Sequence, residues 1–71
     1  MRIAVVKAAY DDDASVWYVE HSDVDGLRVE GETIEAFRRN VADAATDLLE
    51  GAGEIHIEII AQASVRAGAP A

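Results

Sequence analysis

Three consecutive aspartates, Asp11, Asp12 and Asp13, form the densest group of potential ligands in the sequence. Hard divalent cations bind several oxygen ligands at once, and neighbouring aspartates can supply two or three of them. However, no spaced pattern of further acids completes a cage, and aspartate is also typical of turns, where its side chain bonds to nearby backbone. We therefore interpret the run as an exposed turn that a partner can contact, and we predict no bound metal.

The other side chains with potential chemistry are too scattered to form a site. The sequence has no cysteine, which excludes disulfides and thiolate zinc sites. His21 and His56 fall on the second and fourth predicted strands, and the first strand lies between these two in the sheet. A shared zinc ion is therefore not expected. Ser15, Ser22 and Ser64 lack the base and orienting group that activate a nucleophile. We expect no cofactor and no catalytic residue.

The charge of the chain narrows the class of partner. Its 71 residues include 14 acids and 6 Lys or Arg, for a formal net charge of −8. This balance argues against direct nucleic-acid binding, which needs a basic patch. It suits a basic protein partner, although acidity also serves solubility alone. No apolar run approaches the roughly 20 residues of a membrane span, and Lys7 interrupts the apolar N-terminal run, so a cytoplasmic protein is expected.

The first part of the chain predicts three short strands. Arg2–Tyr10 is apolar on both alternating faces, as in a central strand covered on both sides. The aspartate turn leads to a second strand at Ser15–His21, in which Trp17 and Val19 share one face. After the loop "SDVDG", a third strand is predicted at Leu27–Glu30, with Leu27 and Val29 directed inward.

A helix is predicted from Ile34. Gly31 ends the third strand, and Thr33 is a suitable N-cap because its hydroxyl accepts an otherwise unpaired backbone N–H. Gly51 or Gly53 is expected to end the helix in a left-handed conformation. Apolar residues recur at three- and four-residue intervals, which is typical of a helix with one buried side: Ile34, Phe37, Val41, Ala44, Ala45 and Leu48. We expect Trp17 and Phe37 to meet in the core.

A fourth strand at Glu54–Ser64 completes a β-β-β-α-β order. If this strand lies beside the first, it runs parallel to it and the spatial order is 3-2-1-4. The fold class is then α+β, with one helix on one face of a four-stranded sheet. We expect one domain at residues 1–64 and a tail at 65–71. The other face would be bare and partly apolar, carrying some of the following residues: Val6, Tyr10, Val16, Tyr18 and Ile60.

The run "YDDDASVWYVEHSDVDGLRVEGETIEAFRRNVADAATDLLE" resembles the HicB-like antitoxin domain, and within that group a short subfamily of unknown function. The matching features are the acidic turn between two strands, the "DGLRVEG" segment followed by Thr33, and the amphipathic helix. The resemblance implies a fold like a trimmed ribonuclease H. It also implies binding to a small basic toxin of the HicA type, a ribonuclease that cleaves mRNA and that the antitoxin blocks.

The sequence departs from the family pattern at several points. Its loop Ser22–Gly26 lacks the prolines of the typical "PDLPG" loop, and we expect no DNA-binding module after the fourth strand. Ribonuclease H chemistry needs carboxylates in the middle of the first strand, and no acid lies between Arg2 and Tyr10. We therefore expect a binding module that is not an enzyme and that has no DNA-binding domain of its own.

Two functional hypotheses follow. The first is an antitoxin-type module that neutralises a basic ribonuclease toxin by protein contact. The second is an orphan domain without a toxin partner, which self-associates as a dimer or tetramer through its bare face and its fourth strand. In both, direct binding to nucleic acid or membrane is not expected. The residues predicted to contact a partner are Tyr10, Asp11, Asp12, Asp13, Tyr18, His56, Glu58 and Ile60.

Overall fold

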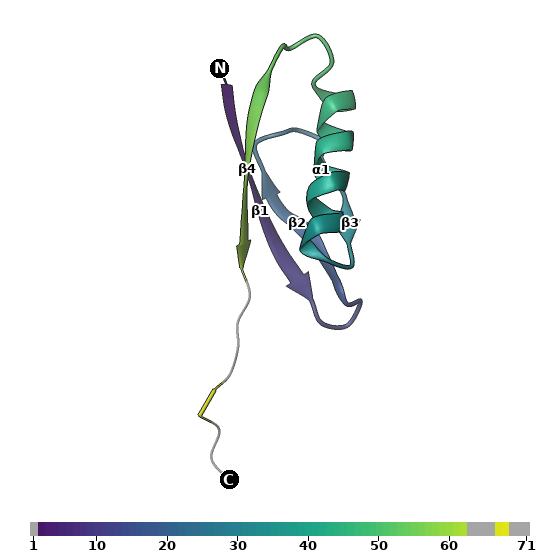
Figure 1. Ribbon diagram of the computed structural model, residues 1–71, viewed down its shortest axis with the longest axis vertical. Coiled ribbons are helices and arrows are strands. Elements are labelled where there is room, and N and C mark those ends of the chain that lie inside the picture. The colour runs from purple at the N-terminus through teal and green to yellow at the C-terminus, as the bar shows by residue number, and fades with distance from the viewer. Residues whose placement is uncertain (1, 63–66, 69–71) are drawn as a thin grey trace.

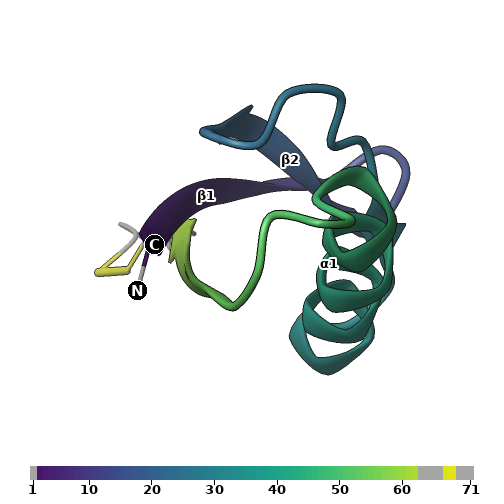
Figure 2. The same cartoon turned by 90° about the horizontal axis from the view of Figure 1, so that it is seen from above.

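The computed structural model describes residues 2–62 and 67–68 (Figure 1). Four strands form one sheet of order β3-β2-β1-β4, and a single helix lies against one face of it (Figures 1 and 2). The elements are β1 (Arg2–Asp11), β2 (Val16–Ser22), β3 (Glu30–Gly31), α1 (Ile34–Leu48) and β4 (Ile55–Gln62). The α+β class, the element order and the strand order predicted from the sequence are confirmed.

β1 is the centre of the sheet because it pairs on both sides. It runs antiparallel to β2, with an irregularity in the register between Lys7 and Ala8. At the end of this hairpin, Asp11 Oδ1 accepts the backbone N–H groups of Asp13 (2.9 Å) and Ala14 (3.2 Å). Ser15 then takes a positive φ of 58° to return the chain. The aspartate run therefore forms the predicted turn, and its first side chain stabilises it.

β4 lies parallel to β1 along its whole length. The register runs without interruption from Arg2 opposite Ile55 to Ala9 opposite Gln62. A parallel neighbour needs a crossover, and α1 provides it. The predicted end of this strand at residues 63–64 lies outside the described residues. So does the predicted tail at 65–71, apart from residues 67 and 68.

The third strand is shorter than predicted and displaced along the chain. The sequence predicted Leu27–Glu30, whereas β3 comprises Glu30 and Gly31, opposite Tyr18 and Trp17. Leu27 is buried as expected, but from a loop in which its N–H donates to the Val24 carbonyl (3.3 Å). The Leu27 side chain reaches the core although its backbone is not paired in the sheet. The prediction, which relied on hydrophobicity alone, therefore placed the strand wrongly.

α1 begins as predicted. Thr33 Oγ1 accepts the Ala36 N–H (3.0 Å), and the Thr33 carbonyl accepts the Phe37 N–H (2.9 Å). These bonds satisfy donors that a helix N-terminus leaves unpaired. One turn later, Asn40 Nδ2 donates to the Glu30 carbonyl (2.7 Å), which ties the helix to β3. At the other end, the prediction of a left-handed glycine cap is wrong: the helix ends at Leu48 and its C-cap, Leu49, has a φ of −106°, while Gly51 and Gly53 take positive φ in the loop that follows.

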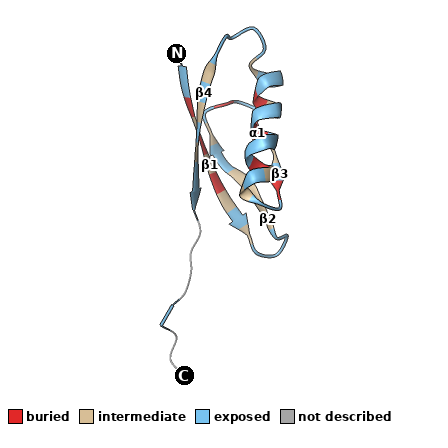
Figure 3. Cartoon of the chain, in the orientation of Figure 1, coloured by how far each residue is buried: buried red, intermediate tan, exposed pale blue. Residues whose placement is uncertain are grey.

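The core lies between α1 and the middle of the sheet (Figure 3). Val6, Phe37 and Val41 are its fully buried large side chains. The buried cluster comprises Ala4, Val6, Ala8, Val24, Leu27, Phe37 and Val41. Trp17 packs against this cluster, as predicted, but is only partly buried. Leu48, predicted to belong to the buried stripe, is 48% exposed, whereas Leu49 packs against the core.

Val6, one of the five residues from which the bare face was predicted to draw, is instead buried in the core. Because successive residues of a strand point to opposite faces, Ala4, Val6 and Ala8 all point toward α1. β1 is apolar on both sides, so its sequence pattern did not show which side the helix covers. The pairing partners in β2 and β4 decide that question.

Candidate functional site

The face of the sheet opposite α1, here called the open face, has no described segment packed over it (Figure 2). The strand registers place its residues, because paired residues point to the same side. It comprises Ile3, Val5, Lys7, Ala9, Asp11, Val16, Tyr18, Glu20, His21, Glu30, His56, Glu58, Ile60 and Gln62. A large uncovered sheet face of this kind is the best candidate surface for binding another molecule.

Four of the predicted contact residues lie on the open face. Tyr18 comes from β2, and His56, Glu58 and Ile60 come from β4. Ile60 is 49% exposed, although it is a large apolar residue. Asp11 belongs to the same face, at the C-terminal end of β1.

Tyr10 was predicted on the same face, and the structure places it on the other one. It follows Ala4, Val6 and Ala8 in the alternation of β1, and it is paired with Trp17. The two rings meet edge to face, with centroids 5.3 Å apart and planes at 64°. Tyr10 therefore lies on the helix side of the sheet, where it packs on Trp17 and remains 39% exposed.

Asp12 and Asp13 lie in the turn beyond the end of β1, where both are exposed. They are thus outside the open face. The eight predicted residues do not form one surface, but five of them do.

The open face is acidic as well as apolar. It carries the carboxylates of Asp11, Glu20, Glu30 and Glu58. Among the residues that the described strands place on this face, Lys7 is the only Lys or Arg. Lys7 Nζ lies 3.2 Å from Glu20 Oε1, so its charge is already matched. The surplus of negative charge would attract a basic surface.

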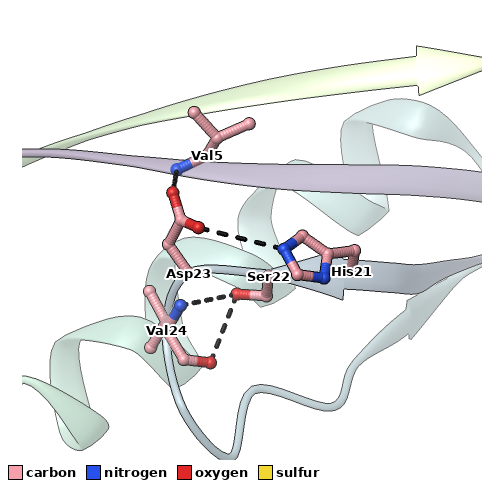
Figure 4. Close-up of polar contacts among 5 residues, drawn as sticks. All are labelled: Val5, His21, Ser22, Asp23 and Val24. Atoms are coloured by element: carbon pink, nitrogen blue, oxygen red, sulfur yellow. Dashed lines mark hydrogen bonds and ion pairs between the residues drawn. The ribbon is translucent and has the colours of Figure 1, made fainter.

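Asp23 is a structural residue of this region that the sequence pattern did not reveal (Figure 4). Its Oδ2 accepts the Val5 N–H (2.9 Å), and its own N–H donates to the Val5 carbonyl (3.0 Å). Its Oδ1 lies 3.9 Å from His21 Nε2. Asp23 therefore pairs with β1 beyond the last residue of β2, with a side-chain oxygen in place of a strand carbonyl. The signal available in the sequence was an aspartate directly after a strand.

Replacing Asp23 with alanine is expected to lower the free energy of unfolding by about 1 kcal/mol, because the Val5 N–H loses its acceptor. Asn is the matched control, since an amide oxygen can still accept that bond; Asp23→Asn is expected to lose less than half as much. Urea unfolding followed by circular dichroism measures both. Equal losses for the two variants would contradict the assigned role of the oxygen.

A groove between α1 and β4 is a second feature that the sequence did not predict. α1 packs mainly against β3 and β2, so it leaves the helix side of β4 incompletely covered (Figure 2). Two hollows of about 770 and 490 Å³ adjoin there, and Ala42 and Ile57 line both of them. Ile55, Ile57 and Ile59 form the floor and are half-buried. The helix was predicted to cover one face of the sheet, and at the β4 edge this cover is incomplete.

The described residues show no other chemical site. Within residues 2–62 and 67–68, no three His, Asp or Glu side chains are grouped so that they could hold a metal ion. No helix among the described residues has both the length and the apolar character needed to cross a membrane.

Comparisons with known proteins place the chain among uncharacterised domains. No curated protein sequence matches it. Its fold is similar to that of the hypothetical protein TTHA1013 from the extremely thermophilic bacterium Thermus thermophilus, with a TM-score of 0.78 and 30% sequence identity. That similarity covers 92% of this chain and 99% of the other. Residues 3–67 match the model of a domain of unknown function, DUF1902. The chain therefore belongs to the DUF1902 family.

Proposed function

We propose that this domain is a HicB-like antitoxin module, which neutralises a small basic ribonuclease toxin by direct contact. The observation that carries the proposal is the open face, an uncovered sheet surface with a surplus of carboxylates among apolar side chains. The net charge of −8 and the resemblance around Gly26–Thr33 support the same class of partner. The proposal places the protein in the cytoplasm, where an mRNA-cleaving enzyme acts.

The open face offers both parts of a typical protein interface. Tyr18 and Ile60 provide apolar area at positions that are not needed for the core, and tyrosine is common at interfaces because it joins apolar area to a polar tip. Glu20, Glu30 and Glu58 surround them and would steer a basic partner into place. In this proposal the domain inhibits by covering the toxin, so it needs no catalytic group of its own.

The test mixes the purified domain with a HicA-type toxin and measures both complex formation and RNA cleavage. We expect a stable complex, loss of cleavage and an affinity that falls as salt is added, because charged surfaces are screened. Absence of both binding and inhibition would count decisively against the proposal.

A pair of charge-reversal variants locates the contact. Glu20→Lys combined with Glu30→Lys changes the open face, and it is expected to weaken binding by roughly 100-fold, since like charges then meet a basic partner. Asp43→Lys combined with Asp47→Lys makes the same change in net charge on the exposed side of α1. That control is expected to weaken binding less than about fivefold. Equal losses would show that net charge, and not the open face, governs the interaction.

A further inference from the structure

The two edges of the sheet differ in how well they are protected against pairing with another chain. β3 offers only two residues, and a very short edge strand gives little to pair with. β4 offers eight residues, keeps an uninterrupted register with β1, and contains no Lys, Arg or Pro. Charged residues, prolines and bulges are the usual means of blocking an edge. β4 has no proline and no irregularity in its register, and Glu58 is its only Asp, Glu, Lys or Arg, so most of its edge is unprotected.

The contacts of Asp23 show which backbone groups of β4 face this edge. Val5 directs both its N–H and its carbonyl to Asp23, on the side of β1 away from β4. Successive residues alternate, so Ala4 directs its groups toward β4. In a parallel ladder, the residue opposite Ala4 then directs its own groups away from β1. That residue is Ile57, and Ile55 and Ile59 share its orientation.

From this geometry we infer that β4 pairs antiparallel with β4 of a second copy of this chain, with Ile57 on the two-fold axis. An antiparallel ladder pairs outward-facing residues with outward-facing residues. Isoleucines of one copy therefore lie opposite isoleucines of the other. In the register centred on Ile57, the two Ile57 side chains meet, and Ile55 lies opposite Ile59 of the second copy.

The polar side chains of β4 on the open face select this register. Centring on Ile57 places His56 opposite Glu58 of the second copy, and the symmetry repeats that pair. Centring on Glu58 would place two glutamates opposite each other, and centring on His56 would oppose two histidines. Centring on Ile59 would leave Glu58 opposite an isoleucine. Two carboxylates directly opposite each other destabilise a ladder, whereas an imidazole N–H opposite a carboxylate can donate a hydrogen bond to it, so the Ile57 register is the self-complementary one.

The inferred dimer also covers apolar surface that the single chain leaves half-exposed. Paired residues point to the same side, so both α1 helices lie on the same face of a continuous eight-stranded sheet. The two grooves beside α1 then share a floor of isoleucines, in which each Ile57 gains a neighbour. Small domains without disulfides commonly gain stability from association, and this chain has no cysteine.

Sedimentation velocity on the full chain tests the inference. At micromolar concentration and about 0.15 M salt, where long-range repulsion between acidic chains is screened, we expect a dimer. Glu58→Lys places a lysine opposite His56, and His56→Glu places two carboxylates opposite each other. Each change is expected to weaken the dimer roughly tenfold. The double variant His56→Glu with Glu58→Lys places opposite charges across the ladder and is expected to return to within about threefold of the original.

His56 and Glu58 are both exposed on the open face, and Nε2 of His56 lies 3.7 Å from Oε1 of Glu58. Because neither side chain is buried, the variants are expected to fold, and circular dichroism checks this. Glu30→Lys at the opposite edge is the control and is expected to leave the dimer unchanged. A monomer at about 100 μM, well above any useful affinity, overturns the inference. The register is overturned if the chain dimerises but the double variant loses as much dimer affinity as the two single variants together. The inference is independent of toxin binding, because either can hold when the other fails.

Discussion

Replacing Gly31 with alanine is expected to lower the free energy of unfolding by about 3 kcal/mol, because the backbone of α1 lies directly against this residue. A β-carbon at position 31 would overlap the Phe37 backbone nitrogen and lie 2.7 Å from its Cα. These are backbone atoms of a helix that Thr33 caps and Phe37 anchors, so they cannot move aside as a flexible side chain would. Relief of the overlap would require β3 and α1 to separate.

Gly53→Ala provides the matched control for this prediction. Gly53 has a φ of +84°, and no atom lies within 4 Å of the position that a β-carbon would take there. Alanine at this position costs only the left-handed conformation, about 1–2 kcal/mol. Chemical unfolding of both variants measures the difference. If Gly31→Ala proved the milder of the two, the close contact between β3 and α1 would be wrong.

Replacing Phe37 with alanine is expected to cost about 3–5 kcal/mol, the usual range for a buried phenylalanine. Phe37 is 0% exposed and packs among Val6, Leu27 and Val41 in the core cluster. A domain of this length is stable by only roughly 4–11 kcal/mol in total. The variant should therefore be close to unfolding, with a midpoint in urea that falls sharply.

Two further variants keep this prediction measurable if the alanine variant does not fold. Phe37→Leu retains most of the volume and is expected to lose about 1–2 kcal/mol. Leu48→Ala removes a side chain of the same helix that is 48% exposed, and should lose less than about 1 kcal/mol. Similar losses at positions 37 and 48 would contradict the observed division of α1 into a buried and an exposed side.

The two proposals use different groups of the same sheet. The side chains of the open face, which include Glu58 and Ile60 of β4, would bind a basic partner, and the backbone edge of β4 would bind a second copy. In the inferred dimer the two open faces join into one surface, since the antiparallel pairing keeps them on the same side. Toxin binding by the Glu20 and Glu30 variants tests the first proposal, and sedimentation of the His56 and Glu58 variants without toxin tests the second, so each can fail alone.

Local chemistry was enough to predict most elements of this fold, with β3 the exception. The aspartate turn and the Thr33 cap depend on neighbouring residues in the chain, and both were found where expected, whereas Leu48 of the predicted apolar repeat is exposed. The strict alternation of β4 likewise placed His56, Glu58 and Ile60 on one face. The strand order followed because a parallel neighbour needs the crossover that α1 provides.

Tertiary structure alone decided how those elements face one another. β1 is apolar on both sides, so only its register with β2 and β4 assigns Val6 to the core and Tyr10 to the helix side. Leu27 is buried without strand pairing, so hydrophobicity misplaced β3. The groove beside β4 depends on how far α1 lies across the sheet. Such long-range packing leaves no periodic trace in the sequence, because it joins residues that are distant along the chain.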